Sequence, residues 1–283
     1  MSGALIVCPT PIGNLADVTL RVLDALNAAD GAACEDTRHS QTLLRRHGIS
    51  LPLISLTEHN EAARIPGLVE RIGAGKRICL LSDAGMPALS DPGSRLISAV
   101  LEAGLPVEVL PGPSAVTAAL VASGLPSDRF AFLGFLPRAE GALTRLLDEA
   151  DGWRVTLVAF EAPGRLPRTL ERLAARAPER PVAVCRELTK LHEEVVRGTA
   201  AEVAERFREA PRGELTLVLG AVEAAPAGSS DVDASLAELR AAGLGARQAA
   251  RLVARLTGLP ARDLYDRASS RYCLLYTSDA ADD

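Results

Sequence analysis

Short apolar runs alternate with amphipathic segments along most of this chain, and this alternation limits its fold more than any other feature. Runs typical of buried strands occur at 4–8, 31–36, 52–56, 77–83 and 107–112. Segments with helical spacing lie between and after them, at 17–29, 39–47, 61–73, 93–103 and 114–122. Alternation of strand and helix predicts a parallel, doubly wound sheet, so residues 1–122 are expected to form an α/β domain. Asp17 is the expected N-cap of the first helix.

A second series of apolar runs follows a turn-rich break at 123–130. Strands are expected at 130–136, 153–160, 181–187, 192–198 and 214–220. The helices between them are expected at 140–150, 164–177 and 199–209. These segments predict a second α/β domain over 123–221.

The remaining residues have a different composition. Residues 222–233 are rich in Ala, Gly and Ser and are expected to form a linker. Residues 234–271 predict short helices in a helix-turn-helix-like unit. The final segment, 272–283, contains "CLLYTSDAADD", which resembles a translated sequencing adapter, so it is expected to be foreign to the natural protein.

The charge of the chain bears on its partners. The formal net charge is −5, and without the three Asp residues of the tail it becomes −2. A nearly neutral chain binds nucleic acid only through a local basic patch. Residues 239–271 carry seven Arg and two Asp, and Arg247, Arg251 and Arg255 recur at helical spacing on one face. This face is either an RNA-backbone contact or a solvated helix surface.

Neither a membrane nor an oxidising compartment is expected for this chain. It has no apolar run of about 18 residues and no basic start followed by a long apolar stretch. Its cysteines form no C-x-x-C pair, and most lie in apolar runs, namely Cys8, Cys34, Cys79, Cys185 and Cys273. Reduced, buried cysteines in a cytoplasmic protein are therefore expected.

Ligands of open α/β sheets bind in the loops that follow the strands. The first such loop, "CPTPIGNLAD" at 8–17, has one Gly and two Pro where a dinucleotide-binding fold has G-x-G-x-x-G. Proline has no backbone N–H to donate to a phosphate, so this loop argues against NAD, FAD or ATP. The chain also has no G-x-x-x-x-G-K-[ST] motif.

The loop "SDAGMPALSDPG" at 82–93 repeats Ser-Asp among several Gly and Pro residues. It lacks the pattern of a nucleophile elbow, the acid spacing of a calcium loop and the His or Cys ligands of a zinc site. It is therefore either a rigid loop whose Asp83 binds a small polar ligand, or a turn followed by a helix cap. Ser90 or Asp91 is expected to cap the next helix, with Pro92 in its first turn.

Two further strand ends carry unusual loops. "LPGPSA" at 110–115 places Ser114 at a helix start, and "CEDTRHS" at 34–40 groups Glu35, Asp36, Arg38 and His39. Each loop alone fits a cap or an ion pair. Several special loops at one sheet edge favour a binding site.

Seven segments in order carry a family resemblance: "TPIGNLAD", "EDTRHS", "SDAGMPALSDPG", "LPGPSA", "FLGFLPR", "TLVAFEAPGRLPRTL" and "RELTKLHEEVVRGT". Over roughly 4–221, and more loosely over 234–270, the chain resembles the tetrapyrrole methylase superfamily, in the branch that methylates the 2′-oxygen of a cytidine ribose in 16S ribosomal RNA. The resemblance implies S-adenosylmethionine bound between two α/β domains. It also implies a homodimer that acts on the decoding region of the 30S subunit, and no metal.

The matching motif positions imply the residues that line the cofactor site: Pro11, Ser82, Asp83, Ala84, Pro87, Ser114, Ala115, Phe160, Glu161 and Leu188. One segment departs from the family, because Ala162-Pro163-Gly164-Arg165 stands where Ser-Pro-His-Arg is usual. The missing His removes any role for that side chain. Arg165 remains available for RNA or for an ion pair, and Arg38 is a further RNA-binding candidate.

Methyl transfer to a 2′-hydroxyl requires alignment with the methyl group and benefits from a base. Glu35, Asp36 and Lys190 are the candidate catalytic residues. Lys190 is one of only two Lys in the chain, but it accepts a proton only if its pKa is lowered. Its alternative roles are a phosphate contact or an ion pair with Glu187 or Glu193.

Aromatic residues make up only 3% of the chain, and Phe132, Phe135 and Trp153 are expected to lie mostly in the core. Two other functions compete with RNA methylation. One is methylation of a porphyrin-like precursor, and the other is RNA binding without catalysis. The "EDTRHS" and "RELTK" segments weigh against the first, and the complete set of cofactor loops weighs against the second.

Overall fold

The computed structural model describes residues 3–222 and 229–273. The chain divides into two compact units, Met1–Val222 and Glu223–Asp283. Part of the linker expected at 222–233 (223–228) and most of the tail expected at 272–283 (274–283) lie outside the described residues. No helix in the described ranges is long and apolar enough to cross a membrane.

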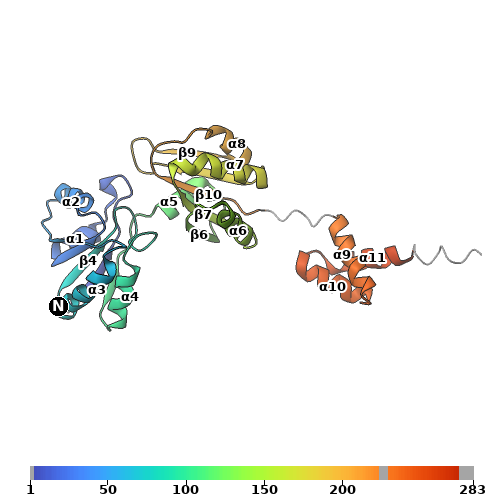
Figure 1. Ribbon diagram of the computed structural model, residues 1–283, viewed down its shortest axis with the longest axis horizontal. Coiled ribbons are helices and arrows are strands. Elements are labelled where there is room, and N and C mark those ends of the chain that lie inside the picture. Colours follow the sequence, from blue (N-terminus) through green and yellow to red (C-terminus); the bar gives the residue numbers. More distant parts are fainter. Residues whose placement is uncertain (1–2, 223–228, 274–283) are drawn as a thin grey trace, which may run out of the picture. The chain divides into compact units, whose positions relative to one another are not determined.

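The first sheet is parallel, as the sequence predicts. It has the order β3-β2-β4-β1-β5 and contains β1 (Ala4–Cys8), β2 (Gly31–Cys34), β3 (Leu53–Ser55), β4 (Arg77–Leu81) and β5 (Val107–Val109). Helices α1 (Leu20–Ala28) and α2 (Thr37–Arg46) pack on one face, and α3 (Glu61–Gly73) and α4 (Ser94–Glu102) pack on the other (Figure 1). The central strands β1 and β2 are apolar and fully buried because helices cover both faces of the sheet, whereas the edge strands β3 and β5 are more exposed.

The second sheet is mixed. Its order is β6-β7-β10-β8-β9, and its strands are β6 (Phe130–Phe135), β7 (Thr156–Glu161), β8 (Pro181–Arg186), β9 (Glu194–Thr199) and β10 (Leu215–Leu219). Only β6 and β7 pair in parallel. Helices α6 (Glu140–Asp151), α7 (Leu166–Arg176) and α8 (Ala200–Arg206) cover one face.

Helix α5 (Ala115–Ser123) covers the other face of the second sheet, although it follows the last strand of the first. Its Val116 and Leu120 pack with Val158 and Val218 of the sheet. The Arg197 guanidinium on β9 donates a hydrogen bond to the Ala122 carbonyl at the end of this helix. The helix expected at 114–122, at the end of the first domain, therefore packs in the core of the second sheet.

Two predicted helix starts are wrong. Helix α1 is capped by Thr19, whose Oγ1 accepts a hydrogen bond from the Val22 N–H at 3.2 Å, whereas Asp17 lies in the short 3₁₀ helix η1 (Leu15–Asp17). Helix α4 follows Gly93, whose φ is +123°, so neither Ser90 nor Asp91 caps it and Pro92 lies before its first turn. A Cβ atom at position 93 would lie 2.7 Å from Leu80, so this turn requires glycine.

Over its described residues, 229–273, the C-terminal unit has three helices, α9 (Ser229–Ala241), α10 (Ala246–Thr257) and α11 (Ala261–Cys273). They enclose a small core that includes Val232, Leu236, Val253 and Leu264. Helix α10 ends at Gly258, which is left-handed with a φ of +72°. The helical character predicted for 234–271 agrees with these elements.

Candidate functional site

A cavity of about 470 Å³ lies between the two sheets of the first unit. The first sheet contributes the loops after β1, β2, β4 and β5, and the second contributes residues at the ends of β6, β7 and β10. The first group of lining residues is Ile12, Glu35, Asp83, Ala84, Gly85, Met86, Leu89, Ser90, Asp91, Ser114, Ala115 and Val116. The second is Phe135, Phe160, Glu161, Ala162, Pro163, Gly213, Glu214, Leu215 and Thr216.

The loop after β4 is tied to the loop after β1. Thr10 and Gly85 exchange two backbone hydrogen bonds, with N–O distances of 2.9 and 3.0 Å. The Thr10 hydroxyl donates to the Ser82 carbonyl at 3.0 Å, and the buried Ser82 hydroxyl donates to the Gly85 carbonyl at 2.9 Å. The hydrogen bonds of Ser82 therefore stabilise the loop, while Asp83 and Ala84 line the cavity.

The second Ser-Asp pair also belongs to the cavity wall. Ala88 and Ser90 have φ values of +68° and +65°, a conformation that costs free energy in residues with a side chain. These two turns bring Leu89, Ser90 and Asp91 to the cavity. The repeated Ser-Asp in the loop was a sequence signal for both parts of the site. The prediction that Ser90 or Asp91 caps the next helix was wrong.

Three carboxylates of the first sheet lie at the cavity with no ion-pair partner in the described chain, Glu35, Asp83 and Asp91. Burial, together with Asp83, Glu58 and Asp36, raises the pKa of Glu35. Burial, reinforced by Glu35 and Asp83, raises the pKa of Asp91 to about 6. The wall contains no Lys, Arg or His, so it favours a cationic ligand.

No group of His, Cys, Asp and Glu among the described residues is arranged to hold a metal ion. Asp83 instead accepts a hydrogen bond from the Asp36 N–H at 3.1 Å, which ties the loop after β4 to the loop after β2.

The carboxylates of the second sheet are neutralised. Glu161 is almost completely buried and forms an ion pair with Arg165 at 2.5 Å. It also accepts hydrogen bonds from the Ala162 N–H and the Thr169 hydroxyl, both at 2.7 Å. Arg165 donates to the Leu136 carbonyl as well, so its guanidinium is bound within the fold. Of the two roles left open for Arg165, the ion pair is the one that the structure contains.

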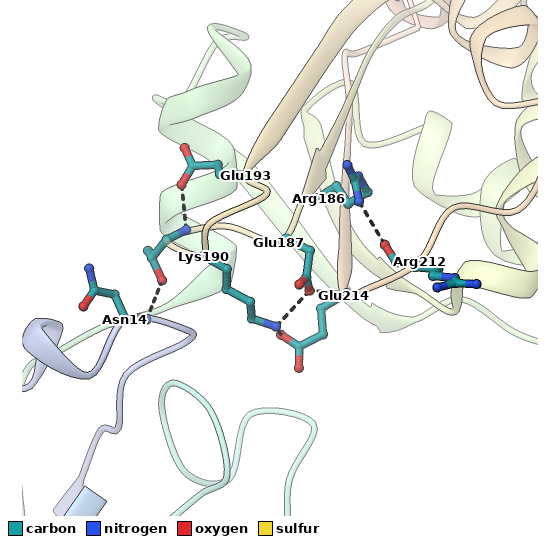
Figure 2. Close-up of polar contacts among 8 residues, drawn as sticks. Asn14, Arg186, Glu187, Lys190, Glu193, Arg212 and Glu214 are labelled. Carbon is teal, nitrogen blue, oxygen red and sulfur yellow. Dashed lines mark hydrogen bonds and ion pairs between the residues drawn. The ribbon is translucent and has the colours of Figure 1, made fainter. Parts of the chain in front are cut away.

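Lys190 lies between two carboxylates, as Figure 2 shows. Its Nζ is 2.8 Å from Glu187 and 3.0 Å from Glu214, which lines the cavity. Partial burial lowers the pKa of Lys190, but the two carboxylates outweigh this effect and the pKa is raised. Of the alternatives left open for Lys190, the ion pair with Glu187 is present, and the raised pKa disfavours the amine as a base. Glu193 instead accepts a hydrogen bond from the Thr189 N–H.

The turn that carries Lys190 also holds the two halves of the first unit together. Glu187 and Thr189 have φ values of +51° and +67°. The Thr189 Oγ1 accepts a hydrogen bond from the Asn14 N–H at 3.0 Å. A Cβ atom at Gly13 would lie 2.4 Å from Lys190 Cγ, so the close contact of the two loops requires glycine.

The predicted cofactor residues divide into two groups. Asp83, Ala84, Ser114, Ala115, Phe160 and Glu161 line the cavity, as does the catalytic candidate Glu35. Outside the lining are Pro11, Ser82, Pro87 and Leu188, all of them buried. The four residues support the loops rather than form the wall.

Asp36 lies outside the cavity wall. It caps α2, accepts a hydrogen bond from the Arg38 N–H and forms an ion pair with the Arg38 side chain at 2.8 Å. Hydrogen bonds from Arg38 lower the pKa of Asp36 to about 2. A carboxylate that is so weakly basic is a poor proton acceptor.

Some wall residues carry no motif signal. Four of them lie at the start of β10 or just before it: Gly213, Glu214, Leu215 and Thr216. The position of β10 beside β7 depends on the antiparallel pairing of the second sheet. Phe135 also lines the cavity, with 59% of its surface exposed. Phe135 and Trp153, 44% exposed, are therefore not the core residues that the sequence predicts.

The predicted RNA-binding arginines other than Arg165 lie on helix surfaces. Arg38 is exposed at the start of α2, and Arg247, Arg251 and Arg255 are exposed on α10. The Arg247 guanidinium also lies over the Tyr265 ring, 5.9 Å from its centroid. These positions are accessible to a large partner.

Known protein families match most of the chain. Residues 4–204 match the family of Tetrapyrrole (Corrin/Porphyrin) Methylases, and residues 226–271 match the RsmI C-terminal HTH domain. Proteins named ribosomal RNA small subunit methyltransferase I are similar in sequence. The one from Halalkalibacterium halodurans is 43% identical, covering 74% of this chain and 72% of the relative. The one from Thermotoga maritima is 41% identical, covering 73% and 93%.

Solved structures share the fold. Uroporphyrin-III C-methyltransferase from Thermus thermophilus, complexed with S-adenyl homocysteine, has a TM-score of 0.55 and 23% identity, covering 77% of this chain and 97% of that one. The methyltransferase CobJ has a TM-score of 0.61 and 20% identity, covering 78% and 95%. The match over most of the chain and the identity to the curated relatives agree with the two-sheet fold. The chain belongs to the tetrapyrrole methylase family, among the small-subunit ribosomal RNA methyltransferases I.

Proposed function

We propose that this protein methylates the 2′-oxygen of a cytidine ribose in the decoding region of 16S ribosomal RNA. In its coarser form, the activity is S-adenosylmethionine-dependent methylation of ribosomal RNA. The acidic cavity wall is the observation that carries the proposal. Five carboxylates and no basic side chain line it, and three of those carboxylates have no counter-cation in the described chain.

The wall fits this methyl donor. S-adenosylmethionine supplies, when bound, an electrophilic methyl group on a positively charged sulfur, and it has no phosphate. Asp83 and Asp91 provide negative charge, while Ala84, Ala115 and Phe160 provide apolar surface. A phosphate-bearing cofactor would meet uncompensated negative charge at the same wall.

Glu35 is the proposed proton acceptor for the 2′-hydroxyl. It lines the cavity, no hydrogen bond from the described chain occupies its carboxylate, and its pKa is raised by burial and by neighbouring carboxylates. Its carboxylate would take the hydroxyl proton of the ribose, to which the bound donor would supply the methyl group. Lys190 has a different role, because it holds Glu214 at the wall as a fixed cation.

The proposal also covers the oligomeric state, the compartment and the RNA contacts. The family resemblance supports a homodimer that acts in the cytoplasm on the assembled 30S subunit. The exposed arginines Arg38, Arg247, Arg251 and Arg255 are proposed to contact RNA, since charge of this sign is needed to bind phosphates.

The test is transfer of tritiated methyl groups from S-adenosylmethionine to 30S subunits that lack the modification, followed by mapping of the labelled nucleotide. Label on the ribose of one 16S cytidine is expected. Label on a porphyrin-like precursor with none on RNA would overturn the proposal. Glu35→Gln is expected to lower kcat about 10²-fold or more, which exceeds the loss of cofactor affinity from removing one of the wall charges.

A further inference from the structure

The exposed face of helix α2 is unusually basic. The helix contains three Arg and one His and no acidic residue. At about 100° per residue, its exposed positions fall in one arc of about 120°. These positions are Arg38, His39, Thr42, Arg45 and Arg46. The opposite face, which includes Leu43 and Leu44, is buried against the first sheet.

Arg45 and Arg46 form no ion pair with a carboxylate of the described chain, whereas many other arginines do. On α7, for example, Arg168 and Arg172 share Glu140. Among the helices of the described residues, only α2 and α10 combine three Arg with no acid. Such a surface in a chain of net charge −5 is a local concentration of positive charge.

This basic face begins at the cavity. Glu35 lines the wall, Asp36 caps the helix, and the Asp36 N–H donates to Asp83 of the same wall. From Arg38 to Arg46 the helix extends about 12 Å away from this point. A ligand that lies along α2 therefore reaches the cavity at the N-terminal end of the helix.

We propose that the face of α2 formed by Arg38, His39, Arg45 and Arg46 docks the phosphate backbone of RNA next to the target nucleotide. The inference rests on the proposed function and names the surface that brings the substrate to that site. Arg38 is partly neutralised by Asp36, so Arg45 and Arg46 contribute most of the attraction. Arginine suits this role because its guanidinium forms bidentate hydrogen bonds with phosphate.

The experiment uses the full chain with both Arg45→Gln and Arg46→Gln. Binding to 30S subunits and to protein-free 16S RNA is measured as a function of monovalent salt at constant Mg²⁺. Loss of two phosphate contacts is expected to reduce the slope of log K against log salt by about 1.4 to 1.8, and to weaken binding about tenfold or more at about 0.1 M salt. Both side chains are exposed, so the fold and the cofactor Kd are expected to stay unchanged.

The matched control is Arg206→Gln with Arg208→Gln, which removes the same charge from two exposed arginines that are paired with Glu194 and Glu205. It is expected to bind RNA as the unmodified chain does. An unchanged slope in the α2 variant, or an equal loss in the control, would overturn the inference. So would weaker binding to 30S subunits with unchanged binding to free RNA, because the partner of α2 would then be a ribosomal protein. Absence of methyl transfer by the unmodified chain would instead refute the proposed function, while the binding slopes still test α2.

Discussion

The two walls of the cavity differ in whether their carboxylates have a counter-cation. On the wall from the first sheet, Glu35, Asp83 and Asp91 have no counter-cation in the described chain. On the wall from the second, Glu161 and Glu214 pair with Arg165 and Lys190. Loss of the cation beside a buried carboxylate destabilises the fold, whereas a carboxylate that has no cation is available to a ligand. This difference underlies the proposal that the first wall binds the methyl donor and accepts the proton, while the second wall supports the fold.

Removal of a cation from the second wall should have the largest effect. Arg165→Met leaves the Glu161 charge buried without its partner, so the free energy of unfolding is expected to fall by about 3–5 kcal/mol. Urea denaturation measures this loss. The double variant with Glu161→Gln should recover part of it, since no buried charge remains. A loss below about 1 kcal/mol in the single variant would show that the pair is not what stabilises this wall.

Removal of Asp83 from the first wall should affect binding more than stability. Asp83→Ala is expected to weaken S-adenosylmethionine binding by about 10- to 100-fold, because a charged group contributes about 1.5–3 kcal/mol to a hydrogen bond. Isothermal titration calorimetry measures the Kd. Glu214→Gln is the matched change on the second wall and should alter the Kd by less than about threefold. Equal losses in the two variants would contradict the difference between the walls.

The smallest expected effect concerns the pH dependence of stability. The pKa of Asp91 is about 6 in the folded protein against 3.8 for an unperturbed Asp. Between these values the folded state binds more protons than the unfolded state, so its stability falls as pH rises from about 4 to 6. Asp91→Asn removes this cost and is expected to raise the free energy of unfolding by about 1 kcal/mol above pH 6, after allowance for solvent screening at this half-exposed site.

Denaturation curves at about pH 4 and pH 7 measure the effect, and the gain should vanish at the lower pH. The affinity for S-adenosylmethionine should change in the opposite direction, because ionised Asp91 attracts a cation. A variant with a higher free energy of unfolding and weaker cofactor binding would support the difference between the walls, since it would show that Asp91 lowers stability while it favours binding. Equal stabilisation at both pH values would contradict it.

The sequence predicts the parallel sheet well because its central strands β1, β2 and β4 are mostly buried and its helices have regular spacing. Loop position directly after a strand points to Asp83, whereas the family resemblance implies Ser114 and Ala115, and all three line the cavity. The same local reasoning fails at Asp91, where the φ of +123° at Gly93 delays the helix and turns a supposed cap into a wall residue.

Other parts depend on contacts between segments far apart in the chain. Glu214 reaches the cavity only because β10 pairs with β7 and β8, and no local pattern specifies that order. The role of Lys190 depends on both Glu187 and Glu214. Because Glu214 is distant in the sequence, the residues around Lys190 left several interpretations of its role open. Packing of α5 on the second sheet likewise follows from tertiary contacts rather than from its place in the chain.

The close contact at Gly13 has a consequence for protein engineering. The loop after β1 meets the turn at 187–190 with no room for a side chain, and the Asn14 N–H donates to Thr189. The two halves of the first unit are therefore not interchangeable modules. A chimera that takes its first sheet from one relative and its second from another must transfer Gly13 and the whole turn as a matched set.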